Sequence, residues 1–169
     1  MWESIDDLTF LEVILGHDEH IPTDSGTRPA TWSRGRVDRA LAIIAAQAGD
    51  RAASAAHLLR AAAQLDIGIR LLEHDFTITA AVCAAYLGTP QHACRLLAAV
   101  PMDVRSPSSL QLLLHARRLV REHLDRDTVA AIRSEMVNVD PVAVRREEII
   151  RLRGSAAVDN RDQAESDAH

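Results

Sequence analysis

Aromatic residues are scarce in this sequence, and lysine is absent. Phenylalanine, tryptophan and tyrosine make up 3% of the 169 residues, whereas apolar residues as a whole make up 47%. A sheet-rich fold uses more aromatic and β-branched side chains, so the composition argues against one. Alanine and leucine dominate instead, which favours closely packed helices and a core large enough for one domain. All 19 basic residues are arginine, which indicates a bacterial, GC-rich genome.

Long apolar runs are also missing, and cysteine occurs only twice. The longest runs, such as Leu41 to Ala46, are far shorter than the roughly 20 residues that span a bilayer. The chain does not open with a basic segment followed by an apolar one, as a secretory signal peptide does. We therefore expect a cytoplasmic protein outside the membrane, with Cys83 and Cys94 as thiols of the core.

The N-terminal part of the chain predicts a short helix and a linker. Apolar residues at helical spacing predict an amphipathic helix from Ile5 to Leu15, within a first unit of residues 1–15, and Gly16 follows as a C-cap. Residues 16–35 lack periodicity and predict a loop or linker. The first 26 residues carry seven acidic residues and no basic one.

Glycines divide the next part of the chain into helical hairpins. A helix is expected from Arg36 to Ala48, ending at Gly49, with Asp50 as the N-cap of the following helix. The leucine and alanine pattern of that second helix predicts that it continues unbroken to Glu73.

Further helices follow, which completes an all-α prediction. Asp75 is expected to cap a helix that runs to Leu87 and ends at Gly88. Three later helices begin with a capping residue and proline at the first helical position, at Thr89-Pro90, Ser106-Pro107 and Asp140-Pro141. A shorter helix with Val129, Ile132 and Met136 on one face precedes the last of them. The last helix is expected to end at Gly154, before a disordered tail of residues 155–169. The sequence thus predicts stacked antiparallel hairpins of about seven helices, with a main domain over residues 36–154.

Two of the expected turns resemble the turn between helices A and B of tetratricopeptide-type repeats. The turns are Ala45-Ala46-Gln47-Ala48-Gly49-Asp50-Arg51 and Ala84-Ala85-Tyr86-Leu87-Gly88-Thr89-Pro90. Counted from the glycine, Ala42 and Ala81 match the small residue of helix A, and Ser54 and Ala93 match that of helix B. A third copy would end in Val137-Asn138-Val139-Asp140-Pro141, but Arg117 stands where its small residue belongs.

The resemblance covers roughly residues 36–141 and implies a right-handed superhelical stack that holds a segment of a partner protein. It departs from the family because the two glycines are 39 residues apart rather than 34, and because the helix-A aromatics are missing. A generic helical bundle rich in alanine is the alternative explanation of the same pattern.

Candidate chemical sites are weak in this sequence. His17, Asp18 and His20 supply metal-ligand types in one acidic loop, although a solvated loop explains them as well. Glu73-His74-Asp75 brings a carboxylate beside an imidazole, with capping by Asp75 as the simpler explanation. Single histidines lie on expected helices at His57, His92, His115 and His123.

Arginines gather on the later helices. Arg117, Arg118 and Arg121 lie close together on one helix, and Arg145, Arg146, Arg151 and Arg153 lie on the last. Glu122, Asp125, Glu147 and Glu148 are interleaved with them, which predicts a solvated face with surface ion pairs such as Arg118 with Glu122 and Arg121 with Asp125. Nucleic-acid binding is therefore disfavoured.

Three functional hypotheses follow from these observations. The first is a non-enzymatic scaffold or adaptor that binds a peptide or helix of another protein, with a homodimer as one form of such contact. The second is a regulatory domain that binds nucleic acid or a small effector. The third is an enzyme or metal-binding protein that uses the loop of His17 and His20. The absence of Gly-rich phosphate loops, Gly-x-Ser-x-Gly elbows and Cys-x-x-Cys pairs argues against the third, and no cofactor is expected.

Overall fold

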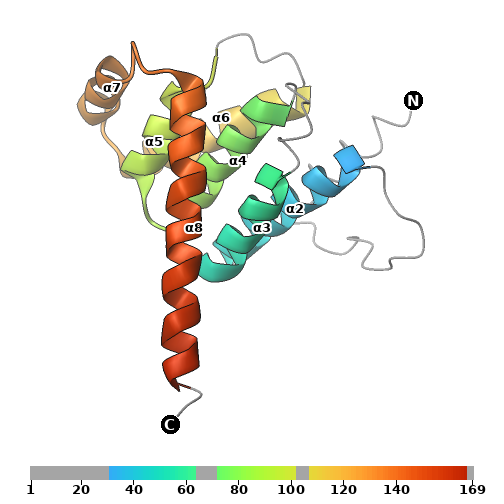
Figure 1. Cartoon of the computed structure of the whole chain (residues 1–169). Coiled ribbons are helices and arrows are strands. Elements are labelled where there is room, and N and C mark those ends of the chain that lie inside the picture. The colour runs from blue at the N-terminus through green and yellow to red at the C-terminus, as the bar shows by residue number, and fades with distance from the viewer. Residues whose placement is uncertain (1–30, 64–71, 102–106, 167–169) are drawn as a thin grey trace.

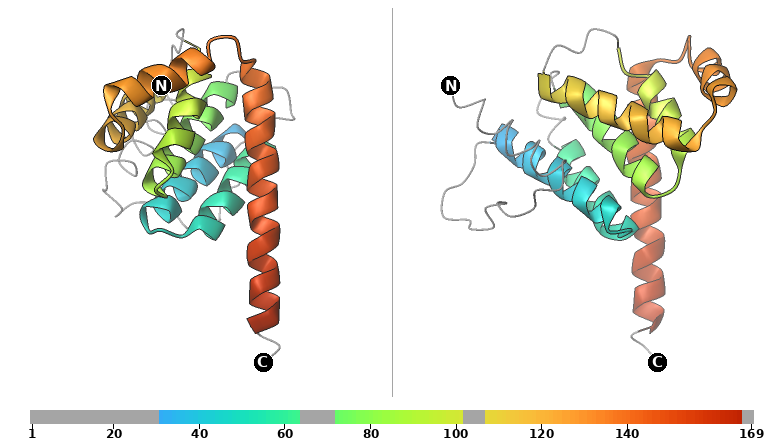
Figure 2. Two further views of the ribbon diagram at one scale, coloured as in Figure 1. Left: turned by 90° about the vertical axis from the view of Figure 1, so that its left-hand side faces the viewer. Right: turned by 180° about the vertical axis from the view of Figure 1, so that it is seen from behind.

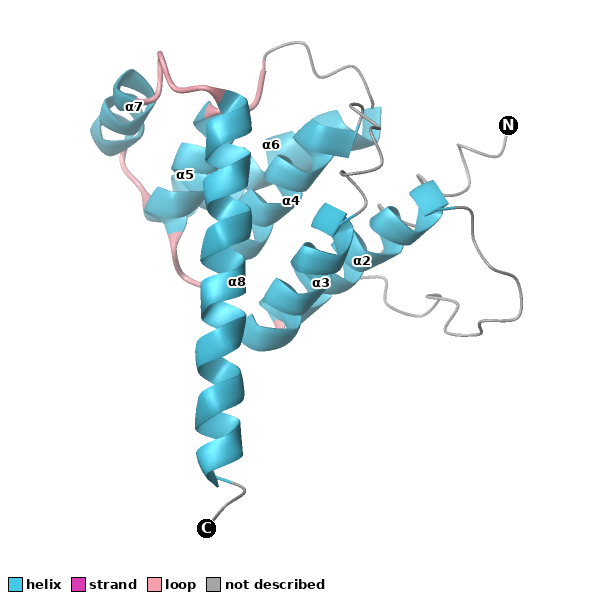
Figure 3. Cartoon of the chain, in the orientation of Figure 1, coloured by secondary structure: helices cyan, strands magenta, loops and turns pink. Residues whose placement is uncertain are grey.

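The computed structural model describes residues 31–63, 72–101 and 107–166, and these residues form an all-helical fold (Figure 1). Within those ranges there are seven helices and no strand, which confirms the predicted fold class (Figure 3). The helices are α2 (Thr31–Gln47), α3 (Arg51–Ala63), α4 (Leu72–Tyr86), α5 (Pro90–Ala98), α6 (Pro107–His123), α7 (Arg126–Glu135) and α8 (Pro141–Ser166).

The helices pack mainly against their neighbours in the chain. α2 pairs with α3, and α4 pairs with α5, so each pair forms an antiparallel hairpin. α4 also packs between α2 and α6, while α5 contacts both α6 and α7. The long helix α8 returns to pack on α3, and its C-terminal turns extend past the bundle (Figures 1 and 2).

The two predicted glycine turns have the same geometry. Gly49 has a φ of 78° and Gly88 a φ of 77°, in the left-handed region that glycine adopts without steric cost. In each turn the glycine N–H donates to the carbonyl three residues earlier, and the next N–H donates to the carbonyl five residues earlier. This is the Schellman arrangement, and it confirms the predicted C-caps.

Small residues close the two hairpins, as the sequence predicted. Ala42 and Ala81 on the first helices, and Ser54 and Ala93 on the second, are each 0% exposed. Their small side chains let the paired helices approach closely. The turn regions of the two hairpins also touch, because the guanidinium of Arg51 donates to the carbonyl oxygen of Leu87 at 3.1 Å.

The largest side chains of the core come from α2 to α6. They are Phe76, Ile43, Leu58, Ile78, Leu96 and Leu112. The thiols of Cys83 and Cys94 are free and buried among them, which confirms that both belong to the core. Burial raises the pKa of the Cys83 thiol to about 12.

Helix α4 begins earlier than the sequence predicted. Leu72 and Glu73 belong to α4 rather than to the preceding helix, so the expectation of one helix from Asp50 through Glu73 was wrong at its end. Asp75 lies inside α4 and does not cap it. Its carboxylate instead accepts from the guanidinium of buried Arg39 on α2 at 2.8 Å and from the hydroxyl of Ser109 on α6. The ion pair engages Oδ2 of Asp75 and the Ser109 hydroxyl engages Oδ1, so both carboxylate oxygens bond to other helices.

The ends of the helical domain also differ from the prediction. α2 begins at Thr31, inside the stretch that was expected to be linker. α8 continues through Gly154 to Ser166, so neither the helix end nor the start of a disordered tail lies at Gly154. A Cβ at Gly154 would meet nothing within 4 Å, and its backbone has no positive φ, so this glycine is a helix residue and not a C-cap.

Aspartates cap three of the later helices. The carboxylates of Asp50, Asp125 and Asp140 accept from the backbone N–H of Ala53, Thr128 and Val142. Thr89 is the N-cap residue of α5, as predicted, but its side chain makes no capping hydrogen bond. Its hydroxyl donates instead to the carbonyl oxygen of Ala84 at 2.8 Å.

No helix in the described part of the chain is long and apolar enough to cross a membrane.

Candidate functional site

The metal-ligand candidates of the sequence lie outside the described residues. His17, Asp18 and His20 all belong to that part of the chain, as does the predicted helix from Ile5 to Leu15. Among residues 31–63, 72–101 and 107–166, no three histidine, cysteine, aspartate or glutamate side chains are grouped so that they could hold a metal ion.

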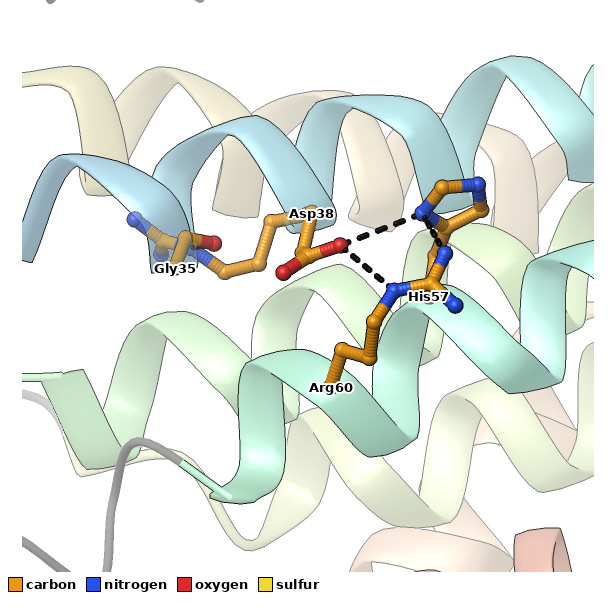
Figure 4. Close-up of polar contacts among 5 residues, drawn as sticks. Gly35, Asp38, His57 and Arg60 are labelled. Atoms are coloured by element: carbon orange, nitrogen blue, oxygen red, sulfur yellow. Dashed lines mark hydrogen bonds and ion pairs between the residues drawn. The ribbon is translucent and has the colours of Figure 1, made fainter. Parts of the chain in front are cut away.

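His57 lies in a polar cluster between the two helices of the first hairpin (Figure 4). Its Nδ1 lies 3.2 Å from Oδ1 of Asp38 on α2 and 2.6 Å from a terminal nitrogen of Arg60 on α3. Nε of Arg60 donates to the same Asp38 oxygen at 3.0 Å. The cluster therefore joins α2 to α3 by an ion pair with a histidine beside it.

Two contacts compete for the same ring nitrogen of His57. Nδ1 lies between Oδ1 of Asp38, which accepts, and the guanidinium of Arg60, which donates, so the ring tautomer decides which of the two bonds forms. Arg60 donates to Asp38 in either tautomer. The cluster is therefore a polar clasp between α2 and α3.

His92 takes part in a second cluster, which joins α5 to α8. Its Nε2 lies 2.7 Å from Oε2 of Glu148, and Arg151 donates to both oxygens of that carboxylate at 2.8 and 2.7 Å. The Glu148 side chain is 1% exposed, although the sequence pattern placed it on a solvated face. Burial pushes the pKa of Glu148 up, but the hydrogen bonds and positive charges of Arg151 and His92 outweigh this and hold it at about 2.

The other histidines of the described chain lie apart from these two. Nε2 of His115 on α6 lies 2.8 Å from the hydroxyl of Tyr86 on α4. Burial and the nearby charge of Arg118 lower the pKa of His115. His123 is exposed at the end of α6, and His74 is half-buried on α4. His57, His92 and His115 each bond to a different partner and do not converge on one pocket.

One small cavity lies between α3, α4 and α8. Its lining includes Ser54, Cys83, Thr89 and Leu152, and its volume is about 20 Å³. A single water molecule needs about 10–15 Å³, so the cavity has room for about one water molecule and is too small for a substrate. The buried hydroxyl of Ser54, which belongs to this lining, has no hydrogen-bond partner among the described residues.

The third pair of helices does not form a hairpin like the first two. α6 ends at His123 and α7 begins at Arg126, after a connection without glycine. α7 packs against α5 and lies beyond the end of α6, not along its length (Figures 1 and 2). Arg117 stands on α6 where the first two hairpins have alanine, and it is too large for the close approach seen there.

One face of α6 is left exposed as a result. Leu110 is 45% exposed and Leu114 is 55% exposed, one helical turn apart. Arg117 and Arg121 continue the same face, because the spacing of four, three and four residues follows one side of an α-helix. We call Leu110, Leu114, Arg117 and Arg121 the α6 stripe. It flanks the buried face that includes Leu113.

The arginine end of the α6 stripe has a third cation beside it. Burial together with the nearby charges of Arg133 on α7 and Arg121 lowers the pKa of Arg117. Nε of Arg117 is buried and has no hydrogen-bond partner among the described residues. No described carboxylate pairs with any of the three guanidinium groups, since the acids near them, Glu122 and Glu135, pair with other arginines.

The predicted surface ion pairs are half right. Nε of Arg118 lies 3.5 Å from the carboxylate of Glu122, as expected. Asp125 does not pair with Arg121, because both of its oxygens are engaged by Thr128 in the N-cap of α7. On α8, Arg151 pairs with Glu148, so this arginine is engaged within the fold.

Sequence reasoning named Arg117 and Arg121 but not Arg133, and it missed the arrangement of the three. Arg117 was noted as a departure from the repeat pattern, and that substitution was the available signal. The position of Arg133 on α7 depends on where α7 packs, which no local pattern in the sequence specifies.

Comparison of the chain with family models, with curated proteins and with solved structures found no match.

Proposed function

We propose that this protein is a non-enzymatic interaction module that binds an amphipathic helix of a partner protein along the α6 stripe. The observation that carries the proposal is the exposure of Leu110 (45%) and Leu114 (55%) on α6. Unlike α2 and α4, α6 has no following helix packed back along it as a hairpin. Exposed apolar residues that are grouped, rather than scattered, mark contact sites.

The stacking of the hairpins supports a helix as the occupant. α2 and α4 each have a second helix packed along them, whereas α7 leaves α6 after Asp125 and packs on α5. A partner helix along the α6 stripe would supply the missing neighbour. Helix-in-groove binding of this kind uses apolar residues one turn apart, which is the spacing of Leu110 and Leu114.

The similarity to tetratricopeptide-type repeats is part of this proposal. The two Schellman turns at Gly49 and Gly88 and the four buried small residues support it. Proteins of that family bind partner segments on their stacked helices.

Binding of nucleic acid is the second candidate, and the unpaired arginines are the observation that favours it. Three guanidinium groups, one of them partly buried, form a small patch on a chain with a net charge of −5. Nucleic-acid sites need a broader basic surface, since affinity comes from many phosphate contacts. Leucines beside arginines are more typical of a protein interface.

Site-specific photo-crosslinking tests the proposal in the organism that encodes the chain. A photoreactive amino acid at Leu114 should crosslink to a partner protein, and mass spectrometry should map the crosslink to an amphipathic helix. The same amino acid at Gln91, exposed on α5 and away from the α6 stripe, is the matched control and should not crosslink. Leu110→Asp should remove the crosslink from position 114.

Three results would count against the α6 stripe as a helix-binding face. They are equal crosslinking from positions 91 and 114, a crosslink to an extended segment, and crosslinking only to other copies of this chain. Leu110→Asp should leave the melting temperature nearly unchanged, because Leu110 is 45% exposed. A large fall in melting temperature would show that Leu110 supports the fold.

A further inference from the structure

We infer that Arg117, Arg121 and Arg133 form an anion-binding site that takes carboxylates of an acidic segment on the partner helix. This inference rests on the proposed function and adds the chemistry of the partner to it.

The three arginines come from two helices that are held together by the fold. Arg117 and Arg121 are one turn apart on α6, and Arg133 on α7 is near enough for its charge to lower the pKa of Arg117. The charge of Arg133 also acts on the Cys94 thiol of α5. The cations are thus brought to one place by tertiary packing.

Three other arginines of the described chain have close carboxylate partners, which Arg117, Arg121 and Arg133 lack. Arg39 pairs with Asp75, Arg60 with Asp38 and Arg151 with Glu148, each at 3.0 Å or less. Arg117 has instead a buried N–H without a partner and two like charges nearby. A buried donor that makes no bond destabilises a protein, and an anion bound to the same guanidinium would offset that cost.

The neighbouring leucines identify the source of the anion. From Leu114 to Arg121 the α6 stripe passes from apolar to cationic within two helical turns, or about 10 Å. A complementary helix needs apolar residues followed, about two turns away, by glutamate or aspartate. A free phosphate would fit the arginines but would make no use of Leu110 and Leu114.

Calorimetric titration of the full chain with a defined peptide tests this site. The probe is a helical peptide of about 18 residues, long enough to hold a helix in water, with leucines one turn apart followed by two glutamates. Its control has glutamines in place of the glutamates. The glutamate peptide should bind at least tenfold more tightly, and added salt should reduce that advantage. Arg117→Gln with Arg121→Gln should abolish the advantage, whereas Arg146→Gln on exposed α8 should not.

Three results would overturn the site. Equal affinity for the two peptides would show that the α6 stripe binds helices without regard to charge, which leaves the proposed function intact. No binding of the glutamate peptide would refute the anion site, while crosslinking from Leu114 decides the proposed function independently. Stabilisation by inorganic phosphate, lost in Arg117→Gln, with no binding of the glutamate peptide would show that the anion is phosphate.

Discussion

The carboxylate of Glu148 on α8 lies 2.7 Å from Nε2 of His92 on α5, and this contact fastens the long last helix to the second hairpin. Arg151, one turn further along α8, holds the other side of the same carboxylate. The Glu148 side chain is 1% exposed, so the ion pair is shielded from solvent on its acidic side. The contact of α8 with α5 therefore depends on the ionisation of Glu148, whereas its packing on α3 uses apolar side chains such as Leu152.

The stability of the protein should fall in acid because of Glu148. Its pKa is held at about 2 in the folded protein, below the ordinary 4.5, so ionised Glu148 stabilises the fold above pH 4.5. That stabilisation, about 3 kcal/mol at about 1.4 kcal/mol per pKa unit, is lost as the pH falls from 4.5 towards 2. Urea unfolding at a series of pH values measures it.

Two variants separate Glu148 from the other carboxylates. Glu148→Gln should lower the free energy of unfolding at neutral pH by about 2–3 kcal/mol and flatten its dependence on acid. Glu147→Gln, at the exposed neighbouring position, should leave both unchanged. The same acid profile in wild type and Glu148→Gln would contradict the role given to this residue.

The glycines of the chain should respond in opposite directions to alanine. Gly49→Ala and Gly88→Ala should each lower the free energy of unfolding by about 1 kcal/mol, because φ values of 78° and 77° suit only glycine. Gly154→Ala should raise it by about 0.5–1 kcal/mol, since a Cβ there meets no atom within 4 Å inside a helix. Thermal unfolding of the three variants checks this, and a stabilising change at Gly49 would contradict the left-handed turn.

Local patterns made the turns predictable and the longer-range contacts unpredictable. A glycine after an apolar helical run predicts a C-cap, and Gly49 and Gly88 are such caps. Gly154 has the same kind of preceding sequence, but the alanines after it allow the helix to continue. Asp75 resembled an N-cap in the sequence. Its actual partner, Arg39, lies on a different helix and far away in the sequence, so no local pattern indicates their ion pair.

The candidate site was predictable only in part for the same reason. Arg117 departs from the small residue of the repeat pattern, and this was visible in the sequence. The burial of Glu148 had a weaker signal, since it falls on one face of α8 with buried Val144 and Leu152 at four-residue spacing. The approach of Arg133 to Arg117 follows from the packing of α7 on α5 and has no signal in the sequence.

The thiol of Cys83 should be unreactive in the folded protein. It is 1% exposed, and burial raises its pKa to about 12, so almost no thiolate is present at neutral pH. Cys94 is also buried, and burial raises its pKa. A thiol reagent at pH 8 should modify neither cysteine in native buffer and both in urea. Rapid labelling of the native protein would show that α4 and α5 open readily.

The Asp75 carboxylate should be among the most sensitive positions of the fold. Asp75→Asn would remove the carboxylate charge that pairs with the Arg39 guanidinium, which is 6% exposed, and breaking a buried ion pair costs about 3–5 kcal/mol. Asp127→Asn, at an exposed position on α7, is the control and should change little. Equal stability of the two variants by urea unfolding would contradict the importance of this ion pair between α2 and α4.

Arg117 should be a position where stability and binding oppose each other. Arg117→Met keeps the long apolar stem but removes the buried N–H that lacks a partner and the repulsion from Arg121 and Arg133. We expect the free energy of unfolding to rise by about 1 kcal/mol, or the melting temperature by about 2–4 °C for a chain of this size. Arg117→Lys keeps the charge and should not be stabilised in this way. If Arg117 serves only to pack α6 against α7, Arg117→Met should instead be neutral or destabilising, because no strain would then be relieved. Differential scanning calorimetry of the two variants beside the wild type distinguishes these cases without any ligand.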